Sequence, residues 1–476
     1  MEILREPRLQ IRLLLLLLLA SLLGLSPRSH LAAQEMHQAQ QAIQSGAFDQ
    51  ASGHVAVAAG QTPDNASLWE LAGHYALQSG QARSAVDYFR EADLESLSPE
   101  GRLELGEAYR QIGDLPAAVR TWQAALSLRD PAAGHLYQLL LEAHLAQSDY
   151  PAAIQDLKVL SGQRPGDARL QYRLGLLLAT QTPELALVYL QQAEELDPSL
   201  STNIEALRRS IQAARLVDDP AYTLLAAGRS LAASGEWPFA AEAFHQSTLA
   251  RPDYAEAWAY LGEARQHLPQ GGEGALEDFE KALKLDPNSL ATHSFLALYW
   301  ERQERYDLSQ PALERAVELD ANNPALLAEL GNLQALNGDL GAALASFRQA
   351  VAHAPLDLDY LSLLAGFSLK YEYQVRQVAL PAARLAVRLA PEDPHALDLM
   401  AQVLLKLGDQ VSAGRFLDRA LQADARFAPA HMHLGLLYLM EAHTTQALDE
   451  FNLARSLDPG GPVASQTGRL LQTYFP

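Results

Sequence analysis

Glycine, alanine or leucine recurs in register along this 476-residue chain at intervals of 33 to 35 residues. The register is visible at Gly73, Gly106, Leu141 and Gly175, and again at Gly228, Gly262, Ala297 and Gly331. A fixed period in this range is typical of a solenoid, in which each repeat buries its apolar face against its neighbours. The chain is therefore expected to be a stack of repeats and not a set of compact globular domains.

The repeat around Gly331 has the pattern of a helical hairpin. Gly331 has no Cβ, so a second helix can approach the first one closely at this point. Gly338 is expected to end the first helix in a left-handed conformation. The second helix then presents Ala343, Phe347 and Ala350 on one face, at the i, i+4 and i+7 spacing of an amphipathic helix.

This pattern resembles the tetratricopeptide repeat family, whose repeat carries an aromatic residue or Leu, then Leu-Gly, Tyr, Ala, Phe, Ala and Pro at these intervals. The series returns elsewhere, for example as Trp258, Leu261, Gly262, Phe279, Ala282 and Pro287. The resemblance implies an all-α fold, a right-handed superhelical solenoid of about twelve hairpins. Composition agrees, because hydrophobic residues make up 49% of the chain but aromatic residues only 7%. Ala and Leu, which supply most of the apolar volume, favour helices.

The register predicts five parts of the chain. Gly175 and Gly228 lie 53 residues apart, one repeat plus nineteen residues, so the phase is lost between them. The predicted parts are a signal peptide or anchor (1–33), an N-terminal array (35–198), a helical joint out of register (199–220), a C-terminal array (221–459) and a capping helix (460–476).

The first 33 residues have the order of parts of a secretory signal. Arginines precede an apolar run from Leu13 to Leu25, which is short for a membrane-spanning helix of about 20 residues. Cleavage after Ala33 would put Leu31 where a small residue is expected, so cleavage and retention as an anchor both stay open. The chain is expected to be exported: periplasmic, extracellular, or held on the outer side of the membrane by this segment.

Charge and cysteine content restrict the partners. The formal net charge of −21 disfavours nucleic acid, because the phosphate backbone is also negative. The absence of Cys leaves no disulfide or thiolate metal site. We expect no cofactor, and membrane contact only through the N-terminal segment if it is uncleaved.

Residues with catalytic chemistry are few. The sequence has no Gly-rich phosphate-binding loop with Lys and no G-x-S-x-G motif. His431 and His433 are two residues apart on a predicted helix, so their rings are expected to diverge. Asp278 and Glu280 are expected on the solvated outer face of a second helix. An enzyme is therefore the least favoured class.

The resemblance implies that the first helices of successive repeats line a concave groove. Ligands in this family contact positions outside the repeat signature. In the C-terminal array these positions hold Leu336, Leu358, Leu369, Leu405, Met432, Leu436 and Met440. In the N-terminal array they hold the secondary candidates Glu70, His74, Glu107, Arg110 and Glu142. Closure of the superhelix or another subunit could instead cover the apolar set.

The expected function is a non-catalytic protein–protein interaction scaffold of the cell envelope, which binds a protein or peptide in the groove. The alternative is an accessory protein of an exopolysaccharide or glycan assembly or export machine, and an enzyme is a distant third. Aliphatic groove residues favour a peptide, whereas exposed aromatic residues would favour sugar. The family's Lys, Asn and Arg set for chaperone C-termini is not found at these positions.

Overall fold

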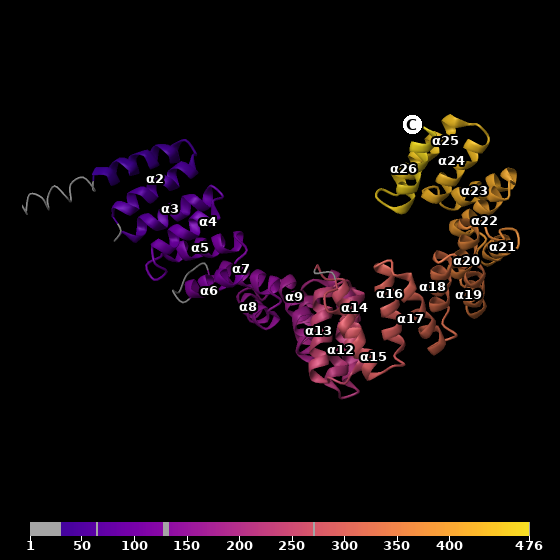
Figure 1. Ribbon diagram of the computed structural model, residues 1–476, viewed down its shortest axis with the longest axis horizontal. Helices are drawn as coiled ribbons and strands as arrows, with labels where there is room; N and C mark the ends of the chain where they lie inside the picture. The colour runs from indigo at the N-terminus through magenta and orange to yellow at the C-terminus, as the bar shows by residue number, and fades with distance from the viewer. Residues whose placement is uncertain (1–29, 63–64, 127–132, 270–271, 476) are drawn as a thin grey trace, which may run out of the picture. The chain divides into compact units, whose positions relative to one another are not determined.

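The computed structural model describes residues 30–62, 65–126, 133–269 and 272–475. Helices occupy most of these ranges, and no strand occurs in them. The all-α prediction is therefore confirmed. The chain folds as two compact units, Met1–Ser234 and Gly235–Pro476 (Figure 1).

Unit 1 begins with a helical segment at residues 30–44. Glu35 of this segment lies within hydrogen-bond distance of His54 in the next helix. The helices that follow are α2 (Phe48–Gln61), α3 (Ala66–Gln78), α4 (Ala82–Glu91), α5 (Pro99–Gln111), α6 (Leu115–Leu126), α7 (Ala133–Ala146), α8 (Tyr150–Gln163), α9 (Ala168–Ala179), α10 (Pro183–Leu196), the short 3-10 helix η2 (Pro198–Leu200), α11 (Ser201–Arg215) and α12 (Pro220–Ala233).

Unit 2 has the same alternation of first and second helices. Its helices are α13 (Trp237–Ala250), α14 (Ala255–Gln266), α15 (Ala275–Leu285), α16 (Leu290–Arg302), α17 (Tyr306–Leu319), α18 (Pro324–Leu336), α19 (Leu340–His353), α20 (Leu358–Lys370), α21 (Ala379–Leu389), α22 (Pro394–Lys406), α23 (Gln410–Ala423), α24 (Ala428–Met440), α25 (Thr444–Leu457) and α26 (Pro462–Tyr474).

Neighbouring helices pack in the order that a solenoid requires. In unit 2, α18 packs on α19, α19 on α20, and the first helices α18, α20, α22 and α24 contact one another in succession. In unit 1, α3 packs on α4 and α5 in the same way. Within each unit, the structure is a helical solenoid of stacked hairpins, as the 34-residue period predicts.

The glycine of the first helix faces a large buried side chain of the second. A Cβ added to Gly331 would lie 3.0 Å from the Phe347 ring, and one added to Gly435 would lie 2.6 Å from the Phe451 ring. Phe347 and Phe451 are among the largest fully buried side chains. Close approach of the paired helices therefore depends on glycine at these positions.

The turn between paired helices also follows the sequence prediction. Gly338 has a φ of +85°, the left-handed conformation expected at the end of α18. Asp339 then caps α19, because its carboxylate accepts a hydrogen bond from the Ala342 amide at 2.9 Å.

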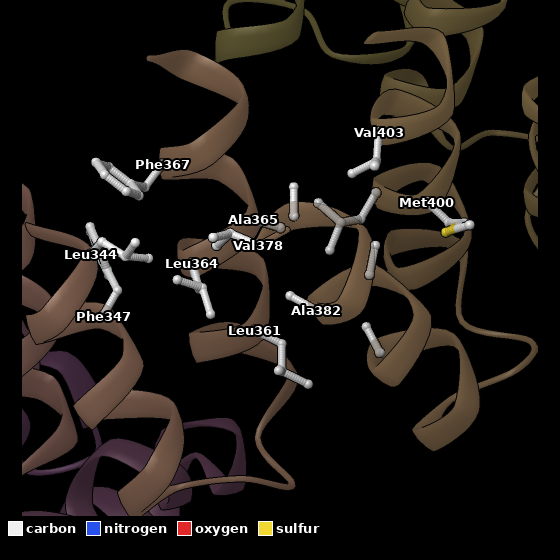
Figure 2. Close-up of a cluster of buried hydrophobic side chains, with 14 of the residues drawn as sticks. Leu344, Phe347, Leu361, Leu364, Ala365, Phe367, Val378, Ala382, Met400 and Val403 are labelled. Atoms are coloured by element: carbon white, nitrogen blue, oxygen red, sulfur yellow. The ribbon is translucent and has the colours of Figure 1, made fainter. Parts of the chain in front are cut away.

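One hydrophobic cluster in unit 2 joins three consecutive repeats (Figure 2). Phe347 and Leu344 of α19, Phe367 of α20 and Met400 of α22 are all buried in it. Because the cluster runs through three hairpins, the repeats in this region stabilise one another as neighbours in a solenoid do.

Residues 199–220 are largely helical, and α11 packs against both α10 and α12. α12 also contacts α9 and α10, in the way that one first helix contacts the preceding pair. A separate melting of the two predicted arrays about this segment stays a prediction. At the other end of the chain, α26 packs on α24 and α25, with Leu470, Leu471 and Phe475 against the cluster around Phe451.

The predicted signal falls almost entirely outside the described residues, which begin at residue 30. Within the described ranges, no helix combines the length and the apolar character needed to cross a bilayer.

Candidate partner-binding site

The first helices of unit 2 present equivalent residues on one face. Each of these first helices carries one member of the series that recurs about every 34 residues, for example Gly331 in α18 and Gly435 in α24. Positions on the helix are counted from this residue. Residues one, four and five positions later lie on one side of the helix, since a turn contains 3.6 residues. The fifth position holds Leu336, Lys370, Lys406 and Met440 in α18, α20, α22 and α24, respectively.

A first hollow, which we call the central hollow, opens on this face across α16, α18 and α20. Its volume is about 380 Å³. It is lined by Glu301, Asn332, Leu336, Ser362, Leu363, Gly366, Phe367, Lys370 and Tyr371. Leu336 and Leu363 are 46% and 39% exposed, so both add apolar surface to this hollow.

A second hollow, which we call the C-terminal hollow, is formed by α22, α24 and the capping helix α26. Its volume is about 360 Å³, and its lining consists of Leu405, Lys406, Leu436, Leu439, Met440 and Tyr474. Met440 is 49% and Tyr474 55% exposed. The C-terminal hollow is therefore mainly apolar, with one cation, whereas the central hollow mixes apolar and polar groups.

The structure brings together some of the predicted groove residues and separates others. Leu405, Leu436 and Met440 meet in the C-terminal hollow, and Leu336 lies in the central hollow. Leu358 and Leu369 are partly buried against the cluster of Figure 2 and line neither hollow.

Met432 does not belong to the open surface. It is only 3% exposed and packs with Phe451 of α25. Eight residues separate Met432 from Met440, which is about 80° of helix rotation beyond two full turns. That rotation turns Met432 toward the second helix of its own hairpin.

The charges along this face change sign from α16 to α22. Glu301 and Glu329, on α16 and α18, lie near each other: burial, and then the charge of Glu301, hold the pKa of Glu329 above its ordinary value. Farther along, Lys406 forms an ion pair with Glu372 at 2.6 Å, and the Lys370 ammonium lies 5.2 Å from the Tyr371 ring centroid.

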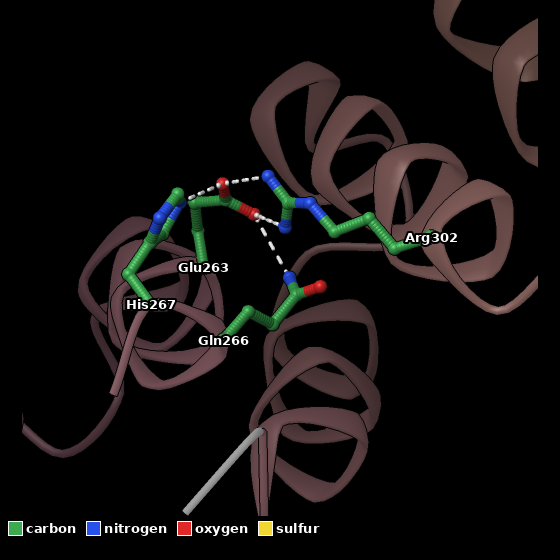
Figure 3. Close-up of polar contacts among 4 residues, drawn as sticks. All are labelled: Glu263, Gln266, His267 and Arg302. Carbon is green, nitrogen blue, oxygen red and sulfur yellow. Dashed lines mark hydrogen bonds and ion pairs between the residues drawn. The ribbon is translucent and has the colours of Figure 1, made fainter. Parts of the chain in front are cut away.

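The α14–α16 end of the face is closed by a polar network (Figure 3). Arg302 donates two hydrogen bonds to the Glu263 carboxylate, at 2.8 and 3.1 Å. Gln266 donates a third at 2.9 Å, and the His267 Nε2 lies 3.0 Å from the same carboxylate. Trp237 stacks on the His267 ring with centroids 3.6 Å apart. These groups satisfy one another and leave little free hydrogen-bonding capacity for a partner.

Four of the predicted candidates of unit 1 are held in contacts between neighbouring helices or with each other. Glu70 accepts hydrogen bonds from the Ser98 amide and hydroxyl at the start of α5. His74 lies 2.7 Å from Glu104 of α5. Glu107 accepts two hydrogen bonds from Arg110, which keep the pKa of Glu107 below its ordinary value.

Glu142 of α7 is exposed, and its charge acts on Arg110 of α5. The structure therefore places these five residues in a polar surface along α3, α5 and α7.

The paired histidines face different neighbours. His431 Nδ1 lies 2.6 Å from Glu450 of α25, whereas His433 Nδ1 lies 2.7 Å from Asp398 of α22. The hydrogen bond with Glu450 raises the pKa of His431. Among the described residues, no group of three or more potential ligands has the arrangement of a metal site.

The expectation that Asp278 is solvated was wrong. Asp278 is 4% exposed, and its carboxylate lies 3.0 Å from the Arg265 guanidinium of α14. Burial raises the pKa of Asp278 to about 6, although Arg265 acts in the opposite direction. The residue follows the lengthened turn after α14, and its position in the first turn of α15 directs it toward α14. Glu280, on the same helix, is exposed as expected.

Comparison with known families agrees with this architecture. The model of the tetratricopeptide repeat matches residues 103–168, 140–201, 225–289 and 296–357. These residues of the chain are therefore tetratricopeptide repeats. Tetratricopeptide repeats form extended binding surfaces, which supports a general role for this chain in protein–protein interaction. Proteins built from such repeats are typically non-catalytic scaffolds.

Several solved structures are similar to this tetratricopeptide repeat chain. Yeast Tom70 is 18% identical, with 86% of this chain and 95% of that chain covered and a TM-score of 0.41. The APC/C hetero-tetramer Cut9–Hcn1 is 15% identical, with 95% and 99% covered and a TM-score of 0.38. Pseudomonas aeruginosa pilF is 20% identical, with 46% and 99% covered and a TM-score of 0.34. A search of curated proteins finds no match.

Sequence reasoning missed several residues that line the two hollows of this tetratricopeptide repeat protein. Lys370 and Lys406 hold the same fifth position as Leu336 and Met440, so the register alone could have identified them. Tyr474 had no such signal, because α26 lies outside the repeats. Its position follows only from the packing of α26 on α24.

Proposed function

We propose that this chain is an exported, non-catalytic scaffold of the cell envelope that binds a protein or peptide partner along the first-helix face of unit 2. The observation that carries this proposal is the C-terminal hollow. Leu405, Leu436, Leu439 and Met440 contribute apolar surface there, and Met440 is half exposed. Burial of one such side chain contributes about 1.5–3 kcal/mol, so a few anchors support micromolar binding after ordering costs are subtracted.

Export is proposed from the sequence of residues 1–33, with its basic start and short leucine-rich run. Fusion of this segment to a reporter enzyme that is active only outside the cytoplasm tests it. We expect reporter activity with the native segment and none after Leu16 and Leu17 are changed to Arg. Equal activity of the two fusions contradicts export.

Partner binding is tested by affinity recovery from envelope extract. The test variant combines Leu336→Glu and Met440→Glu, because both side chains are about half exposed and their replacement leaves the core intact. Val411→Glu is the matched control, since Val411 is 69% exposed on the second helix α23 and lines neither hollow. We expect the partner to be recovered with the wild type and the control but not with the double variant. Equal recovery with all three rules out this face.

One observation favours the alternative role in a glycan assembly or export machine. Tyr371 and Tyr474 line the two hollows, and aromatic faces beside polar groups suit sugar rings. Titration with envelope polysaccharide distinguishes the two roles. Polysaccharide binding that is lost in Tyr474→Ala but retained in Met440→Glu supports the glycan role, and no binding of polysaccharide to the wild type supports a peptide.

A further inference from the structure

The two hollows are separated by cations in a chain that is otherwise strongly acidic. The chain has five lysines and a net charge of −21. Two of the five, Lys370 and Lys406, lie on the rims of the central and C-terminal hollows. They hold equivalent positions on the consecutive first helices α20 and α22, which contact each other. Positive charge, opposite in sign to the net charge of the chain, is thus placed between the two hollows.

Neither lysine forms a buried ion pair within the part of the chain that the structure describes. Lys370 forms no ion pair with any residue that the structure describes, and its ammonium lies 5.2 Å from the centroid of the Tyr371 ring. Lys406 pairs with Glu372, but the two side chains are 40% and 69% exposed. An ion pair this exposed contributes little, so Lys406 can exchange Glu372 for another carboxylate at small cost.

The opposite end of the central hollow carries the opposite charge. Glu301 lines this hollow and forms no ion pair with a described residue. Glu329 of α18 lies near Glu301, whose charge helps to raise the pKa of Glu329. The face therefore runs from carboxylates at α16 and α18, through the central hollow, to Lys370 and Lys406, and ends at the C-terminal hollow.

We infer that the partner is a protein segment in which two groups of apolar side chains flank a run of Asp or Glu. The apolar groups fill the central and C-terminal hollows, and the acidic residues face Lys370 and Lys406. A basic side chain beyond the first apolar group would face Glu301, which fixes the direction of the segment. This inference rests on the proposed function, and charge complementarity is what selects this occupant.

Two series of fluorescent peptides test the inference with the full chain. In one series, two leucine groups are joined by glutamate spacers of different length; in the other, the spacers are lysine. Each partly exposed contact with a lysine contributes roughly a two- to five-fold preference. We therefore expect the best glutamate peptide to bind about tenfold more tightly than its lysine counterpart at low salt, with the preference decreasing as salt is added.

Charge reversal provides the matched control. The variant Lys370→Glu/Lys406→Glu is expected to lose or reverse the preference for glutamate. Lys281→Glu/Lys284→Glu makes the same change in net charge on the exposed face of α15 and is expected to retain it. The outcomes separate the inference from the proposed function. Equal binding of both series that is lost in Leu336→Glu/Met440→Glu overturns the charge inference but supports the groove. Preference for lysine also overturns the inference, and binding of neither series contradicts both.

Discussion

Arg302 of α16 donates two hydrogen bonds to the carboxylate of Glu263 on α14, and the two residues lie 39 positions apart in the sequence. Glu263 is 7% exposed, so its charge is taken out of water and depends on these partners. The pair joins successive first helices on the same face that is open at α18–α24. Equivalent positions of the first helices thus stabilise the array at α14–α16 and form the proposed binding surface at α18–α24.

Removal of the Arg302 side chain should therefore destabilise unit 2. Arg302→Ala leaves Glu263 with only Gln266 and His267, and we expect a loss of about 1–3 kcal/mol in the free energy of unfolding. Arg305→Ala is the control, because Arg305 forms an exposed pair with Asp307 and should destabilise the chain less than Arg302→Ala does. Urea unfolding followed by circular dichroism measures both. Equal effects of the two variants would show that the network adds no stability.

The close approach of paired helices gives a second prediction. In Gly435→Ala the new methyl group meets the Phe451 ring at 2.6 Å, and we expect a loss of about 1–3 kcal/mol. In Gly366→Ala the methyl group meets nothing within 4 Å, so the higher helix propensity of Ala should stabilise the chain by up to about 1 kcal/mol. Thermal unfolding of the two variants compares them directly. A neutral Gly435→Ala would contradict the proposed register.

Asp278 should make stability depend on pH in a defined direction. Its pKa in the folded chain is about 6, above the ordinary value of 3.8, so the folded state holds the proton more tightly than the unfolded state. The stabilisation is therefore present below pH 3.8 and is lost as the pH rises to about 6. Asp278→Asn should exceed the wild type in stability at pH 7 by roughly 1–3 kcal/mol, and the difference should shrink toward pH 4.

Glu280→Gln is the matched control for this prediction, because Glu280 is exposed on the same helix. Urea midpoints measured between pH 4 and pH 7 provide the comparison. A constant difference between Asp278→Asn and the wild type across this range would show that Asp278 does not titrate as inferred.

The two compact units should fold separately. Fragments that end at Ser234 and begin at Gly235 keep α12 with α9, α10 and α11, which it contacts. We expect both fragments to be soluble, helical and cooperative in calorimetry, because each contains several stacked repeats. A second pair of fragments, cut near residue 218, tests whether residues 199–220 act as a joint. If neither pair yields folded halves, this region is an integral part of one array.

Much of the fold could be predicted from the sequence because the same helix–helix contact recurs in successive repeats. The pairing of Gly331 with Phe347 recurs as Gly435 with Phe451, so one interpreted repeat explains the others. The position of α26 could not be obtained this way. It has no repeat pattern, and its contacts with α24 and α25 depend on the surface that the last hairpin leaves uncovered.

The candidate site was only partly predictable. The register predicted Leu336, Leu405, Leu436 and Met440 on the first-helix face, and each of them lines one of the two hollows. It failed for Met432, where a rotation of about 80° from Met440 separates a buried residue from an exposed one. Burial of Asp278 was missed because a single residue in the first turn of α15 faces α14, which the amphipathic pattern does not reveal.

Site-specific photocrosslinking in living cells measures most directly whether the first-helix face of unit 2 binds the partner. A photoreactive amino acid is placed in turn at Leu336, Met440 and Val411, whose side chains are all about half exposed or more. We predict that Leu336 and Met440 crosslink to the same protein and that Val411 on α23 gives no such product. Crosslinking of a partner from Val411, with none from Leu336 or Met440, would contradict the proposed binding face.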